Sequence, residues 1–360
     1  MRVLIAPDSF KGSATAAAAA SALAAGWLAV RPGDEVTRLP LADGGEGTLD
    51  VLAATVAGAR WRQAQVTGPG GDPVRCRWLL LPGRVAVVEL ARASGLPLLA
   101  RPDPMGAHTV GLGEVLGRAL DSGATRILAG LGGSASTDGG TGALTALGAR
   151  FLDAAGRPLP LGGGALAALA SADLSRLRRP PPEGVTCLAD VTAPLLGPRG
   201  AAAVFGPQKG ADAAQIARLE AGLARLAEVL GGDPAAPGAG AAGGTGYGLA
   251  AAWGAVFTPG AAELSRLAGL GRALAEADLV ITGEGRFDQT SLTGKTTGTV
   301  LAAAAAAGVP AALVAGQVSG DPPEGIRVIT LAALAGGPAP ALASPRRWLR
   351  QAARQLAMSP

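Results

Sequence analysis

The chain has 360 residues, of which 49% are hydrophobic, and a formal net charge of only +4. This length suffices for two domains or one large α/β unit with a substantial core. The charge is small and dispersed, which argues against a nucleic acid as partner, and no stretch is long and apolar enough to predict a membrane span. Cys76 and Cys187 lie far apart without a CxxC pattern, which predicts two core residues in a reducing compartment. Because the N-terminus reads as a strand rather than a signal peptide, we expect a cytoplasmic protein.

Lysine is rare in this chain. The sequence contains 28 arginines and three lysines, and it lacks asparagine. All three lysines, Lys11, Lys209 and Lys295, adjoin a glycine. A lysine is a compact point charge and glycine lets a backbone approach a ligand closely, so this pairing favours phosphate binding. The alternative is that the three are chance survivors on the surface.

The chain opens with a βαβα pattern. Residues 2–7 are an apolar run typical of a buried parallel strand, and residues 13–30 predict a helix with Ser13 as N-cap. A strand, a glycine-rich turn and a helix follow within 35–55. This order favours a doubly wound sheet.

The middle of the chain has a different texture. Residues 61–91 predict an antiparallel meander of short strands, after which helices and strands alternate again from 111 to 131. A strand is expected at 185–191, an amphipathic helix at 213–230, and a long irregular loop at 234–248.

The last third returns to regular α/β structure, with strands expected at 277–283, 310–316 and 326–332. The chain therefore starts and ends in one α/β domain. We expect a Rossmann-like doubly wound domain from residues 1–60 and 265–360, with an inserted mixed α/β domain over 61–264.

Four glycine-rich segments follow predicted strands, where ligands of open α/β sheets bind. The first, 8–13, places Asp8, Ser9 and Lys11 before a helix, an arrangement that favours an anion. The second, 43–48, has two acids, Asp43 and Glu46, which suit a metal or a hydroxyl better than a bare phosphate. The alternative for Asp43 is an ordinary helix cap.

The third segment, 130–140, has two interpretations. Gly130, Gly132 and Ala135, with Asp153 about 20 residues on, fit a dinucleotide fingerprint. Because that fingerprint is short and the chain is rich in glycine, chance matches to it are expected. The other interpretation is a phosphate or substrate cradle with the candidate residues Gly132, Gly133, Ser134 and Ser136.

The fourth segment, 283–296, ends in a Gly-Lys-Thr sequence but is no P-loop, because Gln289 stands where that motif needs glycine. Its acids Glu284 and Asp288 are candidate Mg²⁺ ligands, and its basic residues are candidates for a polyphosphate. The candidate phosphate-binding residues are Gly283, Gly285, Arg286 and Lys295.

Four positions outside these segments also stand out. Asp190 lies at a predicted strand end, as a general base or a turn cap, with Arg199 and Lys209 downstream as candidate anion ligands. His108 is the only histidine, which excludes a multi-histidine metal site and leaves it as a helix-entry or core residue.

Taken together, seven stretches resemble the bacterial glycerate kinase family, the type 1 enzymes found with glyoxylate and glucarate metabolism. In family order they are IAPDSFKGS, PLADGGEGT, ASGL, GLGGSASTDGG, ADVTAPLLGPRGA, VFGPQKGA and ITGEGRFDQTSLTGK. The resemblance implies the glycerate kinase I fold, with the active site in a cleft between the two domains. It also implies ATP-dependent, Mg²⁺-assisted phosphorylation of D-glycerate, with 2-phosphoglycerate favoured as product.

On this hypothesis Lys11, Lys209, Lys295 and the 132–136 loop hold phosphate or carboxylate charge. Glu284 and Asp288 lie near Mg²⁺, and Asp190 is the base, with Asp43 as the alternative. The chain departs from the family at Thr137 and Ala193, where asparagine is usual, and at His108, where a hydroxyl residue is usual. Two rival hypotheses are an NAD(P)-dependent oxidoreductase using residues 130–135 and a non-catalytic hydroxy-acid sensor; an oligomer is possible under each.

Overall fold

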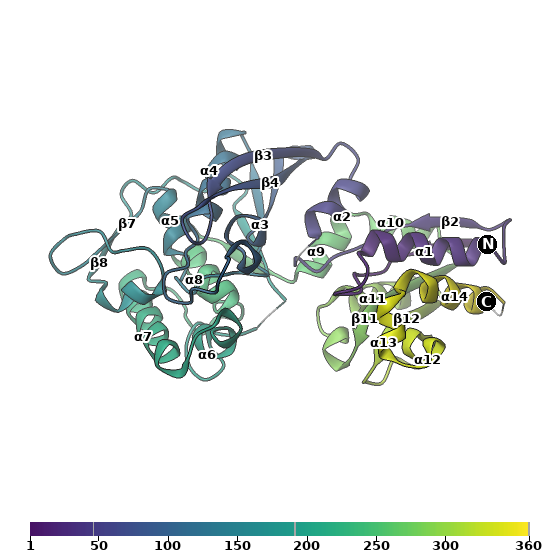
Figure 1. Ribbon diagram of the computed structural model, residues 1–360. Coiled ribbons are helices and arrows are strands. Elements are labelled where there is room, and N and C mark those ends of the chain that lie inside the picture. Colours follow the sequence, from purple (N-terminus) through teal and green to yellow (C-terminus); the bar gives the residue numbers. More distant parts are fainter. Residues whose placement is uncertain (46, 191, 359–360) are drawn as a thin grey trace. The chain divides into compact units, whose positions relative to one another are not determined.

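The structure is a computed structural model that describes residues 1–45, 47–190 and 192–358. The chain divides into two compact units. Unit 1 comprises Met1–Asp43, Asp50–Val56 and Pro259–Pro360, and unit 2 comprises Gly44–Leu49 and Ala57–Thr258. Both chain ends belong to unit 1, where Figure 1 marks them. Each unit combines helices with a sheet, so the predicted α/β fold class is confirmed.

Unit 1 is built on a parallel sheet with the strand order β13-β12-β11-β1-β2. The strands are β1 Arg2–Ile5, β2 Glu35–Arg38, β11 Leu279–Phe287, β12 Ala311–Val318 and β13 Arg327–Thr330. The helices are α1 Ala16–Leu28, α2 Thr48–Thr55, α9 Gly260–Leu267, α10 Leu270–Ala275, α11 Thr296–Ala307, α12 Leu331–Ala335, α13 Pro338–Ala343 and α14 Pro345–Met358, with a 3-10 turn at Gln289–Leu292.

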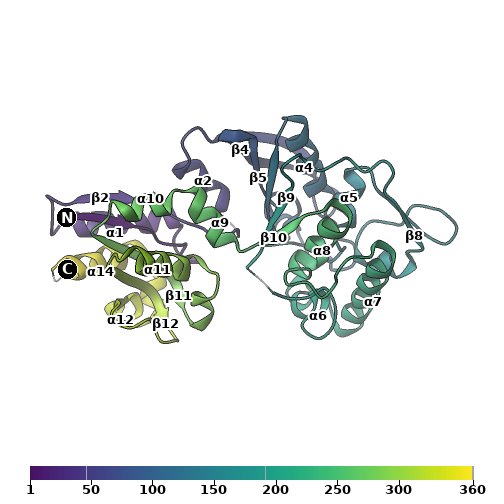
Figure 2. The same ribbon diagram turned by 180° about the vertical axis from the view of Figure 1, so that it is seen from behind.

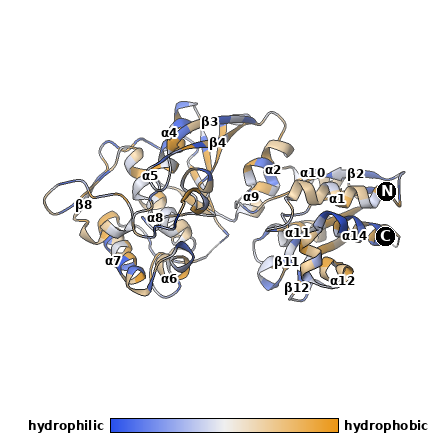
Figure 3. Cartoon of the chain, viewed as in Figure 1, coloured by the Kyte–Doolittle hydropathy of each residue, from blue (hydrophilic) through white to orange (hydrophobic). Residues whose placement is uncertain are grey.

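Helices cover both faces of this sheet, because its strands are apolar on both sides. Along β1, Val3 and Ile5 pack into a core with α1 and α14, while Leu4 packs into a second core with α10 and α11. Figures 1 and 2 both show α1 beside α14. In Figure 3, α14 carries much hydrophilic colour, although Leu349 and its apolar neighbours on one side are buried.

The two faces define where a ligand would bind. Helix α1 follows β1 on one face, and α11 follows β11 on the other. Strands β1 and β11 are direct neighbours. The chain continues from β1 to β2 on one side of this pair and from β11 to β12 on the other, so it leaves the two strands in opposite directions. The carboxyl ends of such a pair form the topological switch point, where open α/β sheets bind ligands.

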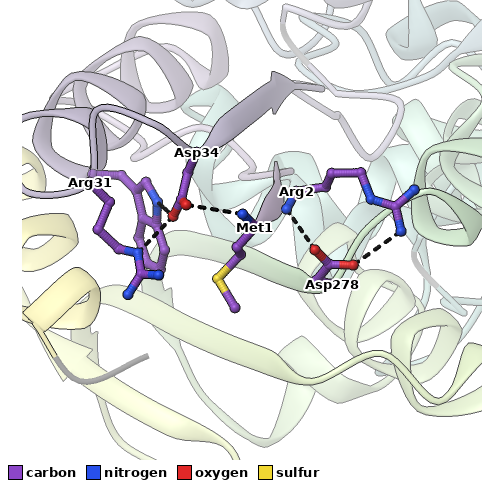
Figure 4. A network of polar contacts seen from close by, with 6 residues as sticks. Met1, Arg2, Arg31, Asp34 and Asp278 are labelled. Atoms are coloured by element: carbon purple, nitrogen blue, oxygen red, sulfur yellow. Dashed lines mark hydrogen bonds and ion pairs between the residues drawn. The ribbon is translucent and has the colours of Figure 1, made fainter.

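A polar network fixes the first strand at its start (Figure 4). The Met1 ammonium donates to Asp34 at 3.0 Å, and the Arg2 backbone N–H donates to Asp278 at 2.7 Å. Burial opposes ionisation of Asp34, but hydrogen bonds from Met1, Trp27 and Arg31 outweigh it and lower the pKa to about 2. The network therefore ties β1 to the turn before β2.

Unit 2 is built on a mixed sheet with the order β10-β9-β6-β5-β4-β3. The predicted meander is confirmed, since β3, β4 and β5 pair antiparallel; from β5 to β10 the pairing is parallel. These strands are β3 Arg60–Thr67, β4 Pro73–Leu81, β5 Val85–Glu89, β6 Arg126–Gly130, β9 Val185–Leu188 and β10 Val256–Thr258. A separate antiparallel pair consists of β7 Arg150–Leu152 and β8 Ser171–Asp173.

The helices of unit 2 enclose one large core that includes both buried cysteines, as predicted. They are α3 Ala91–Ser94, α4 Val110–Asp121, α5 Thr141–Ala146, α6 Ala201–Phe205, α7 Ala213–Leu230 and α8 Ala241–Trp253, with 3-10 turns at Pro82–Arg84, Leu96–Leu98, Gly163–Ala168 and Pro207–Lys209. Figure 2 shows α6, α7 and α8 grouped together. Within the described ranges, no helix is long and apolar enough to cross a membrane.

Several predicted boundaries are wrong. Helix α1 begins at Ala16 with Thr15 as its cap, and the Ser13 hydroxyl instead donates to the Phe10 carbonyl. Strand β9 ends at Leu188, and Val191, the last residue of the predicted strand, lies outside the described residues. Strand β11 continues to Phe287, beyond the predicted end at residue 283.

The predicted loop over 234–248 is wrong in its second half, which belongs to α8. The glycines there permit close packing rather than flexibility. A Cβ at Gly248 would lie 2.1 Å from the Gly139 carbonyl oxygen. Ala242, Gly243 and Gly244 have positive φ and turn the backbone left-handed before the regular helix. Glycine adopts this conformation at little cost, whereas alanine adopts it rarely.

Candidate active site

A cavity of about 410 Å³ lies within unit 1, at the end of the sheet where β1 and β11 finish. It collects predicted residues from three of the four glycine-rich segments. They are Asp8, Ser9, Lys11, Asp43, Glu284, Gly285, Arg286, Asp288 and Lys295. The position matches the switch point of the sheet.

The loop after β1 is held against β11 by backbone contacts. The Asp8 N–H donates to the Gly283 carbonyl at 2.8 Å, and Phe10 and Ala14 form a small antiparallel bridge. A Cβ at Gly285 would lie 3.3 Å from the backbone nitrogen of Lys11, which is tighter than nine in ten real Cβ contacts. Glycine at 285 therefore lets the lysine-bearing loop approach the strand.

Gly283 and its neighbours lie inside β11 rather than in a loop after it. The Gly283 position has a packing explanation, since a Cβ there would lie 1.9 Å from the Val314 carbonyl oxygen. Gly283 does not line the cavity, whereas Glu284 and Gly285 do. The strand thus carries its acid directly into the cavity wall.

Two acids of the cavity, Asp8 and Glu284, resist ionisation. Burial raises the pKa of Asp8 to about 6, and the negative charge of Asp43 adds to this effect. Burial also raises the pKa of Glu284, although the hydroxyls of Thr297 and Ser291 and the Lys295 charge oppose it. Among the described residues, Glu284 Oε1 is buried without a hydrogen-bond partner. Such a site gains stability when a cation or proton enters.

The donor set suits Mg²⁺, which binds oxygen ligands. Asp8, Asp43 and Glu284 supply carboxylate oxygens, and the orphaned Oε1 of Glu284 is an available donor. The described part of the chain contains no group of three or more histidine, cysteine or acidic side chains arranged to hold one ion. Mg²⁺ at phosphoryl-transfer sites is commonly held by one or two protein carboxylates together with substrate phosphates and water.

Asp288 is already engaged with its own turn. Its carboxylate accepts hydrogen bonds from the Thr290 backbone N–H at 2.9 Å and from the Thr290 hydroxyl at 2.5 Å. The hydroxyl contact contributes most to lowering the pKa of Asp288. Lys295 donates to the same hydroxyl at 2.6 Å and lies 3.9 Å from Asp288. Asp288 is therefore connected to Lys295 through the Thr290 hydroxyl.

The 130–140 segment in unit 2 is tightly packed. Ser136 is fully buried, and Lys209, 1% exposed, donates from Nζ to the Ser136 carbonyl. Burial lowers the pKa of Lys209 to about 7, and the Asp138 charge opposes this effect. The hydroxyls of Ser136 and Thr137 are buried, and neither has a hydrogen-bond partner among the described residues.

Asp138 has a structural role. Its carboxylate accepts from the Thr109 N–H and hydroxyl at 2.9 and 2.8 Å, and from the N–H of Gly140 and Gly142. Helix α5 begins only at Thr141, so the fingerprint residue Ala135 does not open a helix. Asp153 is bonded to Arg157 at 2.9 Å within its own turn. The dinucleotide interpretation thus lacks its helix and its free acid.

The remaining predicted residues are scattered through unit 2. Asp190 lies two residues beyond β9 and is half-buried; Arg199 is exposed. Ala193 accepts a hydrogen bond from Gly240 through its backbone carbonyl at 2.9 Å. His108 is buried at the entry to α4, as expected, and burial lowers its pKa. Glu46 lies outside the described residues.

Sequence reasoning missed one wall of the cavity in unit 1. This wall comes from the C-terminal helices and is apolar, with the lining residues Leu331, Pro338, Ala341, Leu342 and Pro345. The segment is an Ala-, Leu- and Pro-rich run without a motif, so no local signal separates it from ordinary core.

Comparison with known proteins decides the family. The model of the glycerate kinase family matches residues 3–359. The chain belongs to the glycerate kinase family. A Bacillus subtilis glycerate kinase is 42% identical over 330 residues, 89% of this chain and 86% of that protein. A glycerate 2-kinase of Escherichia coli K12 is 41% identical over 306 residues, 82% of this chain and 80% of that protein.

The fold comparison agrees with the family. A solved chain described as a glycerate kinase 2 of Salmonella typhimurium LT2 superposes with a TM-score of 0.84 and 38% identity. The match covers 100% of this chain and 98% of that one. This member of the glycerate kinase family is therefore a phosphotransferase, and a kinase family implies ATP as co-substrate.

Proposed function

We propose that this enzyme transfers the γ-phosphoryl group of ATP to the 2-hydroxyl of D-glycerate, giving 2-phosphoglycerate and ADP. The observation that carries the proposal is the cavity of unit 1, where Lys11, Lys295 and Arg286 lie with carboxylates at a switch point of the sheet. Phosphoryl transfer needs positive charge around the phosphates and little covalent chemistry from the protein. The name of the Escherichia coli relative, a glycerate 2-kinase, supports position 2.

Asp8 and Glu284 would hold Mg²⁺, with Asp43 beside them. When bound, the ion would neutralise charge on the phosphate oxygens. Asp288, given above as a candidate ligand, is engaged with Thr290 and would instead position Lys295. Lys11, Arg286 and Lys295 would bind and orient the phosphate oxygens.

Asp190 is our candidate for the base, and Asp43 is the alternative. The substrate hydroxyl oxygen forms a bond to the γ-phosphorus, and the base accepts the proton of that hydroxyl. The bond between the γ-phosphorus and the oxygen bridging to the β-phosphorus breaks, and ADP departs. The variants Asp190→Asn and Asp43→Asn distinguish the two candidate bases. Loss of kcat with unchanged nucleotide affinity identifies the base, whereas loss of Mg²⁺-dependent nucleotide affinity identifies a metal or phosphate role.

The product identifies the activity. Purified protein would be incubated with ATP, Mg²⁺ and D-glycerate, and the product examined by phosphorus–proton correlation NMR. Coupling of phosphorus to the C2 proton is expected. Coupling to the C3 protons would mean 3-phosphoglycerate and would contradict the proposed regiochemistry.

The rival hypotheses make different predictions. An oxidoreductase would bind NADH, but the tie between Asp153 and Arg157 and the late start of α5 lead us to expect no fluorescence change on titration with NADH. A sensor would bind glycerate without releasing ADP. The cluster of charged groups in the cavity favours turnover over sensing.

A further inference from the structure

The cavity of unit 1 has two chemically different sides. One side carries the charged residues described above, which include Lys11 and Lys295. The other is the apolar wall, made of Leu331, Pro338, Ala341, Leu342 and Pro345 from α12, α13 and the start of α14. Figure 3 shows the hydrophobic colour of α12. The charged side suits phosphates, and nothing in phosphoryl transfer requires the apolar side.

Leu342 distinguishes this wall from ordinary core. It is 59% exposed, although its neighbour Ala341 is 6% exposed and packs inward. A single exposed leucine is normal on a protein surface, but here it shares a cavity wall with four other apolar residues. The wall therefore offers apolar area that a ligand could cover.

The cavity also has the size and the polar group that a heterocyclic base needs. About 410 Å³ lies within the usual range of small-molecule sites, roughly 300–1,000 Å³. Gln317, exposed at the end of β12, lines the same cavity. Its amide can both donate and accept, which matches the mixed donor and acceptor edge of a nucleobase.

We propose that the apolar wall at α12–α14 binds the nucleobase of the nucleoside triphosphate, with Leu342 packed on the ring and Gln317 at its edge. The inference rests on the proposed function, because it assumes that the charged side binds the phosphates of the same ligand. Charge complementarity fixes the orientation: the triphosphate lies toward Lys11 and Lys295, and the base toward the helices.

The test compares ligands with and without a base. Titration calorimetry would measure binding of ATP and of inorganic tripolyphosphate, each with Mg²⁺, to the wild type and to Leu342→Glu. We expect the Kd for ATP to rise about tenfold and the Kd for tripolyphosphate to change less than about twofold. Met358→Glu is the matched control, since Met358 is 69% exposed on α14 and does not line the cavity.

The milder variant Leu342→Ala keeps the test valid if Leu342→Glu fails to fold, and circular dichroism checks both. It should weaken ATP binding about threefold. Equal ATP affinity in the wild type and both Leu342 variants would overturn the nucleobase site while leaving the kinase function intact. A wild type that binds tripolyphosphate but not ATP, or neither, would overturn the proposed function and the base site together.

Discussion

The three lysines occupy different surroundings although their sequence contexts look alike. Lys11 is exposed on the loop after β1, and Lys295 is half-buried beside Asp288; both line the cavity of unit 1. Lys209 is buried in unit 2, where it donates to a backbone carbonyl. The adjoining glycines could not reveal this difference, because burial depends on residues distant in the sequence, such as Ser136 and Gly243.

Replacing the cavity lysines by arginine should abolish most activity without unfolding the protein. Lys11→Arg and Lys295→Arg keep the charge, but a planar guanidinium is not equivalent to a compact ammonium at a phosphate. We expect kcat/KM to fall about tenfold or more, with unchanged circular dichroism. Arg62→Lys, at an exposed position on β3, is the control. Near-normal turnover in both lysine variants would remove them from the phosphate site.

Replacing Asp8 by asparagine should stabilise the fold at alkaline pH and at the same time abolish activity. Its folded-state pKa of about 6 lies above the ordinary 3.8, so the unfolded chain loses this proton first as the pH rises. Stability from this group is therefore full below about pH 4 and is lost by about pH 6. Asp8→Asn should raise the unfolding midpoint at pH 8 by on the order of 2 °C, leave it unchanged at pH 4, and abolish turnover.

Calorimetric scans of Asp8→Asn and the wild type at the two pH values check this prediction. A midpoint that falls at pH 8 would mean that the Asp8 carboxylate stabilises the fold and that its charge is already compensated.

Among the elements, the regular strands and helices were predictable and the glycine-rich pieces were not. Apolar periodicity is enough to predict the antiparallel meander and the amphipathic α7. The same rules wrongly predict that β11 ends at Gly283 and that residues 245–248 form a loop, because glycine is locally typical of a break in regular structure. In both places the glycine is required by a neighbouring backbone, at Val314 and at Gly139, which only the tertiary structure reveals.

Helix α1 offers a direct test of this explanation. A Cβ at Gly26 would lie 2.2 Å from the Arg350 carbonyl oxygen of α14. Gly26→Ala should therefore destabilise unit 1 by about 1–3 kcal/mol in denaturant unfolding, despite the better helix propensity of alanine. Gly271→Ala in α10 is the matched control, since a Cβ there meets nothing within 4 Å. It should stabilise by about 0.5–1 kcal/mol.

Equal stabilisation by the two substitutions would show that α1 and α14 can separate at little cost, and that Gly26 is not needed for their packing.

For the whole molecule, the order of strands and glycine-rich segments was sufficient to predict an α/β fold, and the family follows from seven motifs in one chain. The charged side of the cavity was predictable because its residues lie in those motifs. Its apolar wall was not, because α12–α14 are made of common residues whose meaning comes from what they face. Motifs alone therefore identify the residues that would contact the reacting groups, but they miss residues that would contact the rest of the ligand.

Phosphorylation of D-glycerate by ATP is the activity that we propose for this chain. The most direct measurement is the initial rate of ADP release by the purified protein with Mg²⁺ and ATP, with D-glycerate, with L-glycerate and with neither acid. We expect saturable release with D-glycerate and only background release in the other two reactions. Equal release with all three, or none with D-glycerate, would contradict it.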